Sequence, residues 1–131
     1  MIDSPAKTVS FASLPAFGAE LEGGKFYGVT TLKDGTHCAV ILLTNKAQER
    51  MPWKKAMKWA EEAGGVLPTR PVAALLYANA KDQFEPDWHW TSEEAGASYA
   101  WVCYFDDGTQ DYGHEDDYYS AVAVRMIPLI L

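Results

Sequence analysis

Two short helical stretches that follow each other directly restrict the possible folds of this chain more than any other feature. Small and apolar residues recur at helical spacing after Pro52, and Gly64-Gly65 supplies a left-handed stop, which predicts a first helix over about residues 52–63. Thr69 is a suitable N-cap for a second helix over about residues 70–80. A helical pair with no strand between its members argues against a parallel sheet built from βαβ units.

Strand patterns lie on both sides of the helices. Residues 25–33 and 36–44 are rich in β-branched and aromatic side chains, and Asp34-Gly35 between them favours a tight turn, so these segments predict a β-hairpin. After the helices the pattern changes to short aromatic strands, expected at His89–Ser92, Tyr99–Phe105, Thr109–Tyr112 and Ser120–Leu129. The order of hairpin, two adjacent helices and short antiparallel strands indicates the α+β class.

The length of 131 residues suits one core. Residues 1–22 mix Ser, Pro, Ala and Gly, and we expect them to form an N-terminal arm that packs through Phe11, Leu14 and Phe17 on a single domain of residues 23–131. The longest aliphatic run is far shorter than the roughly 20 residues that cross a membrane, and the N-terminus lacks the order of a secretory signal. The expectation is a soluble protein, without membrane insertion, that is cytoplasmic at synthesis.

Charge is distributed unevenly along the chain. The net charge is −7, but the segment after residue 80 holds eleven acidic and two basic residues, whereas the segment before it holds seven and nine. A field of this sign repels phosphate groups, so nucleic acid and anionic membrane surfaces are disfavoured as partners and a basic partner is favoured. The alternative is that the acidic residues only solubilise an aromatic-rich region. The two cysteines, Cys38 and Cys103, lie in apolar strand-like runs without a short Cys-x-x-Cys spacing, which predicts buried free thiols.

Several short motifs occur in the order found in one known family. They are Trp53-x-x-Ala56, Ala63-Gly64-Gly65, Leu67-Pro68-Thr69, Trp90-Thr91-Ser92, Ala100-Trp101, Phe105-x-x-Gly108 and Val124-Arg125. Over roughly residues 24–127 the chain resembles the Lcl C-terminal-like domain family, which belongs to the C-type-lectin-like group together with formylglycine-generating enzymes and receptor-binding proteins of some phages. Thr91 stands where the family commonly has Ser.

The resemblance implies a C-type-lectin-like mixed fold, with paired terminal strands, two helices on one flank and a long irregular segment that carries recognition. It also implies a core position for Trp90, Trp101 and Phe105, which fall in its motifs. Short single-domain members of the family resemble phage or prophage products, so a place on the virion is an alternative to the host cytoplasm.

Aromatic residues concentrate where the acidic residues do. Ten of the seventeen aromatic residues lie between Phe84 and Tyr119, interleaved with Asp, Gly, Ser and Gln as in binding surfaces where Tyr gives rigid contact area. We therefore expect an acidic, aromatic-rich binding face over about residues 85–119, with ordinary packing as the alternative for its rings. The candidate ligand-binding residues are Tyr99, Tyr104, Tyr112, His114, Asp116 and Tyr118.

Motifs for catalysis are missing from the sequence. The cysteine pair of the formylglycine-generating enzymes has no counterpart, and His114-Glu115 is followed by Tyr118 where a helical zinc-protease motif needs a second histidine. No catalytic residue is proposed. Loop carboxylates can hold calcium, so a calcium site is an alternative to a solvated acidic loop, with Asp106, Asp107 and Asp111 as its candidate ligands, and no other cofactor is expected.

The sequence thus favours a non-enzymatic recognition module, encoded by a phage or prophage, that binds a protein or glycan. An intracellular inhibitor of a host defence protein is one alternative. Another is a structural or virion subunit that assembles through the apolar strand Ile127–Leu131. A calcium-dependent binder and an enzyme rank behind these, and the oligomeric state stays open.

Overall fold

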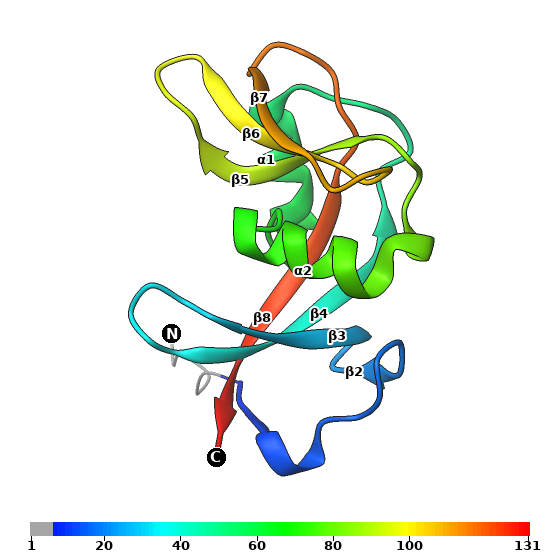
Figure 1. Cartoon of the computed structure of the whole chain (residues 1–131), viewed down its shortest axis with the longest axis vertical. Helices are drawn as coiled ribbons and strands as arrows, with labels where there is room; N and C mark the ends of the chain where they lie inside the picture. The colour runs from blue at the N-terminus through cyan, green and yellow to red at the C-terminus, as the bar shows by residue number, and fades with distance from the viewer. Residues whose placement is uncertain (1–6) are drawn as a thin grey trace.

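Two β-sheets and two α-helices make up the structure, a computed structural model that describes residues 7–131 (Figure 1). The larger sheet has the order β1-β8-β4-β3-β2, formed by Val9–Ser10, Val122–Ile130, His37–Lys46, Gly24–Thr31 and Glu20–Leu21. The smaller has the order β5-β6-β7, formed by Trp88–Glu94, Tyr99–Tyr104 and Gln110–His114. The helices are α1 (Trp53–Glu62) and α2 (Arg70–Ala80), with one-turn 3₁₀ helices at Phe11–Ser13 and Lys81–Gln83. The α+β class is confirmed.

The hairpin predicted around Asp34-Gly35 is β3 and β4, which pair antiparallel from Gly24↔Leu43 to Thr31↔His37. The Asp34 carboxylate accepts a hydrogen bond from the backbone N–H of Thr36 at 2.9 Å, and Gly35 takes the left-handed φ of 89° that the turn requires. Local turn chemistry therefore sets the register between β3 and β4.

Both predicted helices are confirmed to within a residue or two at each end, and their limits have local causes. The Thr69 hydroxyl accepts a hydrogen bond from the backbone N–H of Val72 at 3.3 Å, which caps α2. After α1, Gly64 adopts a φ of 93°, and the N–H of Gly65 returns to the carbonyl of Ala60 at 3.0 Å.

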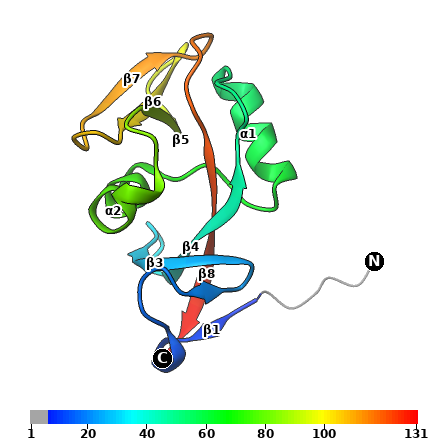
Figure 2. The same cartoon turned by 90° about the vertical axis from the view of Figure 1, so that its right-hand side faces the viewer.

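The helices cover opposite faces of the central strands, as Figure 2 shows for α1 and α2 on either side of β4 and β8. Alternate residues of β4 divide between two apolar clusters. Ala39, Ile41 and Leu43 pack in the cluster that contains α1, whereas Val40 and Leu42 pack in the cluster that contains α2. The resemblance implied two helices on one flank, and this expectation is wrong. The helices lie on opposite flanks because β4 and β8 are buried on both sides.

The N-terminal arm adds strands to the large sheet. Val9 and Ser10 pair parallel with Leu129 and Ile130, so the first described strand joins the last strand of the chain. Leu14 packs against the core as expected, and the Phe17 ring contacts Phe26 at a centroid distance of 5.8 Å. Phe11 is 54% exposed and forms no aromatic ring pair among the described residues, so its predicted packing role is wrong, whereas Phe17 keeps its contact with Phe26 although it is 57% exposed. Residues 1–6 of the expected arm lie outside the described residues.

The two cysteines are buried and unpaired with each other, as predicted. Burial raises the pKa of the Cys103 thiol to about 11, even though a hydrogen bond with Gln110 acts in the opposite direction. Burial also raises the pKa of Cys38, with a smaller contribution from the charge of Asp34. Both side chains are therefore protonated, unreactive parts of the core at neutral pH.

Candidate functional site

Four aromatic side chains form a square on one face of the small sheet. The register places Tyr99 of β6 opposite His114 of β7, and Trp101 opposite Tyr112. Residues two apart on a strand share a face, so all four rings lie on the same side. Their centroids are 5.4 Å apart for Tyr99 and His114, 5.4 Å for Trp101 and Tyr112, and 5.8 Å across the diagonal from Tyr99 to Tyr112, all close to perpendicular. We call these four residues the aromatic square.

The square is open to solvent although the same face is buried farther along β6. Tyr99 is 42% exposed and Tyr112 55% exposed, and His114 is also exposed. Cys103, two residues beyond Trp101, is fully buried in the cluster that contains α2. Helix α2 therefore covers one end of this face and leaves the other as a rigid aromatic surface, with three of the predicted binding residues on it.

Trp101 is the border between the covered and the open part. It is only partly buried, so its predicted core position is wrong, whereas Trp90 and Phe105 are confirmed in the core. The guanidinium of Arg70, the first residue of α2, lies 3.5 Å from the centroid of the Trp101 ring. No local sequence pattern indicates this contact, because it joins residues 31 positions apart on different elements.

Arg70 is held in place by more than its stack on the ring. Its Nε donates to the Gln110 side-chain oxygen at 2.9 Å, and the Gln110 amide donates in return to the Arg70 carbonyl at 2.9 Å. The backbone N–H of Arg70 donates to a carboxylate oxygen of Glu93 at 2.7 Å. A groove of about 580 Å³ runs from Arg70 past Glu93 and Gln110 to Lys33. The start of α2 is thus tied to both outer strands of the small sheet.

The acidic loop after β7 begins beside the square. The backbone N–H of Asp116 donates to Nδ1 of His114 at 3.2 Å, and a carboxylate oxygen of Asp116 lies 3.7 Å from the same nitrogen. The Asp116 side chain is 92% exposed. Asp116 therefore brings an accessible negative charge to one corner of the square.

The two remaining candidate residues, Tyr104 and Tyr118, are not part of the aromatic square. Tyr104 points to the opposite face of β6 from Tyr99, because the two are separated by an odd number of positions, and it stacks on Trp88 at 4.8 Å. Tyr118 is 63% exposed in the loop after β7, and none of the aromatic ring pairs found in residues 7–131 includes it. The structure thus joins Tyr99, Tyr112, His114 and Asp116 in one site and places Tyr104 on the other face of β6, while Tyr118 stays exposed in the loop that contains Asp116, without a ring contact to the square among residues 7–131.

The candidate calcium ligands do not converge. Asp107 uses its carboxylate to accept the backbone N–H of Thr109 at 2.9 Å, a contact that lowers its pKa. Asp111 accepts the N–H of Tyr112 at 2.8 Å, and Asp106 is exposed in the turn. Within residues 7–131 no three Asp, Glu, His or Cys side chains are grouped so that they could hold a metal ion. These carboxylates serve turns and strand ends.

The carboxyl groups of Glu94 and Glu115 lie close together where the end of β7 meets α1. Burial raises the pKa of Glu115, and the neighbouring carboxyl of Glu94 raises it further, while Lys54 acts in the opposite direction. One side-chain oxygen of Glu115 is buried and has no hydrogen-bond partner among the described residues. The backbone of Glu115 accepts from the N–H of Trp53 at 3.0 Å, so the pair belongs to the packing of α1 on the small sheet.

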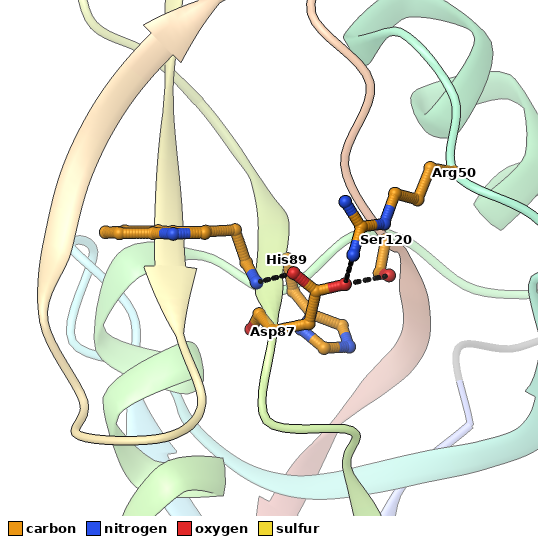
Figure 3. A network of polar contacts seen from close by, with 5 residues as sticks. Arg50, Asp87, His89 and Ser120 are labelled. Carbon is orange, nitrogen blue, oxygen red and sulfur yellow. Dashed lines mark hydrogen bonds and ion pairs between the residues drawn. The ribbon is translucent and has the colours of Figure 1, made fainter.

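Asp87, His89 and Ser120 lie together in a polar network that has the residue types of a hydrolase triad (Figure 3). Ser120 Oγ donates to the Asp87 carboxylate at 3.5 Å, which also pairs with Arg50, while Nδ1 of His89 contacts the backbone oxygen of Asp87 at 3.0 Å. A serine nucleophile needs its hydroxyl on the imidazole, and neither contact provides this. Burial lowers the pKa of His89, as suits a packed neutral ring. The network fastens the start of β5 to two loops.

Comparison with known proteins adds no relative: no protein-family profile matches the sequence, and no curated protein matches it. Within the part of the chain that the structure describes, neither helix has the length and apolar character needed to cross a membrane.

Proposed function

We propose that this protein is a non-enzymatic recognition module that binds a protein or glycan partner through the aromatic square and the adjoining acidic loop, within residues 85–119. One observation carries the proposal: four aromatic rings lie together, partly exposed, on a face whose other half is buried. Monomeric proteins rarely expose clustered aromatic rings without a binding role.

The construction of the square supports this proposal. The rings stand on two paired strands and brace each other edge to face, so few rotamers remain to be lost on binding. Arg70 and its hydrogen bonds hold Trp101 from the side of α2. A site with this rigidity suits binding better than chemistry, which also needs an activated nucleophile or a proton donor placed on a substrate.

The C-type-lectin-like relationship and a phage or prophage origin are part of the same proposal. The pairing of β1 with β8, which joins the two ends of the described chain, supports the relationship. Binding through irregular segments on a mixed scaffold is the use that the resemblance implies. A phage product without enzymatic activity would act on the virion, or in the host cytoplasm as an inhibitor of a defence protein.

The test is affinity capture with the full chain from a bacterial lysate, its envelope fraction and purified virions, read by mass spectrometry. The test variant is Tyr99→Ala with Tyr112→Ala. The matched control is Phe11→Ala, because Phe11 is 54% exposed, close to the 55% of Tyr112, but lies in the N-terminal arm. We expect a partner that the control retains and the double variant loses. Equal capture by both variants, with both folded, would reject the square as the binding surface.

Assembly through the C-terminal strand is a second candidate, favoured by one observation. Ile130 and Leu131 are 57% and 91% exposed at the C-terminal end of β8, whereas Ile127 is buried and Leu129 is partly buried. Only the last two residues of the predicted interface are therefore available. Light scattering at rising concentration checks it: a dimer that Ile130→Ser disperses supports assembly, and a monomer throughout excludes it.

A further inference from the structure

We infer that the aromatic square binds an arginine side chain of a protein partner, with the guanidinium against the exposed Tyr99 and Tyr112 rings and donating to the Asp116 carboxylate. This inference rests on the proposed function and names the chemistry of its ligand. Three observations support it. The protein's own Arg70 guanidinium lies on the Trp101 ring, the neighbouring rings of Tyr99 and Tyr112 are exposed, and the accessible Asp116 carboxylate lies beside His114.

Arg70 shows what kind of group the square accepts. Its guanidinium lies 3.5 Å from the Trp101 ring centroid, and its Nε is hydrogen bonded to Gln110. A stacked cation with one fixed donor is thus already part of the surface, at the corner next to α2. The rings of Tyr99 and Tyr112 offer the same π-electron surface, and no cation of residues 7–131 is found over either of them.

The charge beside the open rings selects a cation as well. Asp116 holds its carboxylate 3.7 Å from the His114 ring, and its side chain is 92% exposed. The segment after residue 80, which carries the rings, holds eleven acidic and only two basic residues, so its charge disfavours an anionic guest such as a sulfated glycan, although Arg70 adds one positive charge at the Trp101 corner. An aromatic surface bordered by carboxylate suits a partner that is both flat and positively charged.

Arginine fits this site better than lysine. A guanidinium is planar and weakly hydrated, and it stacks on a ring while its edge keeps several N–H donors for a carboxylate. A lysine ammonium is a compact and strongly hydrated charge that cannot stack in this way. The partner is therefore expected to present an exposed arginine, and a neutral side chain of the same shape should not replace it.

The experiment uses the full chain and two peptides, Ac-Gly-Arg-Gly-Arg-Gly-NH2 and the same peptide with citrulline in place of arginine. Citrulline keeps the planar shape and loses the charge. Binding is followed by NMR of the aromatic side chains. We expect saturable shifts of the Tyr99, Tyr112 and His114 rings with the arginine peptide at millimolar concentration, and at least tenfold weaker binding of the citrulline peptide. Equal binding of the two peptides overturns the inference.

Two variants separate a specific site from general attraction to an acidic protein. Asp116→Asn should weaken binding of the arginine peptide about fivefold. The control Glu61→Gln also removes one negative charge, but from an exposed position on α1, and should leave the binding unchanged. An equal loss in both variants overturns the inference. Asp116 is almost fully exposed, so its variant is expected to fold, and amide spectra check this.

The outcome is distinguishable from that of the proposed function. A captured partner that depends on Tyr99 and Tyr112, combined with no preference for arginine over citrulline, overturns this inference and leaves the recognition role standing. Arginine-specific peptide binding that depends on Asp116 supports the inference, whether or not the lysates contain a natural partner.

Discussion

The stack of Arg70 on Trp101 should contribute measurably to stability, because it joins α2 to the small sheet. Arg70→Met removes the guanidinium but keeps an apolar stem of similar length. The backbone contacts of Arg70 with Glu93 and Gln110 do not involve the guanidinium and can remain. The variant therefore isolates two interactions, the stack at 3.5 Å and the Nε hydrogen bond to Gln110 at 2.9 Å.

The expected loss follows from these two interactions. A partly buried hydrogen bond contributes about 1 kcal/mol net, and a cation over an aromatic ring at a partly exposed site contributes about 0.5–1 kcal/mol. Arg70→Met should thus lower the free energy of unfolding by about 1.5–2 kcal/mol. In a chain of this size such a change lowers Tm by roughly 5–8 °C.

A double-mutant cycle with Trp101→Leu separates the stack from the hydrogen bond. If the guanidinium interacts with the ring, the two substitutions should couple by about 0.5–1 kcal/mol. Urea unfolding followed by far-ultraviolet circular dichroism gives the four free energies without relying on the fluorescence of Trp101. Coupling below about 0.3 kcal/mol, the usual limit of additivity, would refute the claim that the stack is an energetic contact.

Three further perturbations probe other parts of the structure. Gly65→Ala would place a Cβ 2.4 Å from the Val124 carbonyl oxygen, so we expect urea unfolding to show a free energy of unfolding lower by more than about 2 kcal/mol. A decrease of less than about 0.5 kcal/mol would contradict the close approach of the two backbones. Because burial lowers the pKa of His89, the unfolded chain takes up the proton first, and stability should fall as pH drops below about 6.5, less steeply in His89→Gln. Burial and Glu94 raise the pKa of Glu115, so wild-type stability is lost as the pH rises above 4.5, the ordinary pKa of a glutamate. Glu115→Gln should therefore raise Tm at pH 7 and leave Tm unchanged at pH 4. Equal shifts of Tm at both pH values would contradict this.

Much of the fold could be predicted from the sequence because local signals determine it. The turn at Asp34-Gly35, the cap at Thr69 and the stop at Gly64-Gly65 act within a few residues of themselves, and each is present in the structure. The placement of the helices on opposite faces could not be predicted in this way. It depends on the burial of β4 and β8 on both sides, which arises from contacts between distant segments.

The site was predicted in part for the same reason. The sequence predicts Tyr99, Tyr112 and His114 as binding residues because they lie beside turns in a segment rich in aromatic and acidic residues, and both features are visible in the local sequence. Tyr104 was assigned wrongly to the same surface, although strand alternation puts it on the other face of β6 from Tyr99. Arg70 was missed because no local pattern indicates that the start of α2 lies over a ring of β6.

The position where α2 begins explains why the square is open at all. Helix α2 covers the face of β6 at Cys103. The cover ends at Trp101, because Arg70, whose guanidinium lies over the Trp101 ring, is the first residue of the helix. Thr69 caps the helix at this point, and the carbonyl of the buried Pro68 accepts the N–H of Ser92 at 2.9 Å, so the chain is held against β5 and cannot continue as helix. The residues that begin α2 therefore also determine how much of the aromatic face is left for a partner.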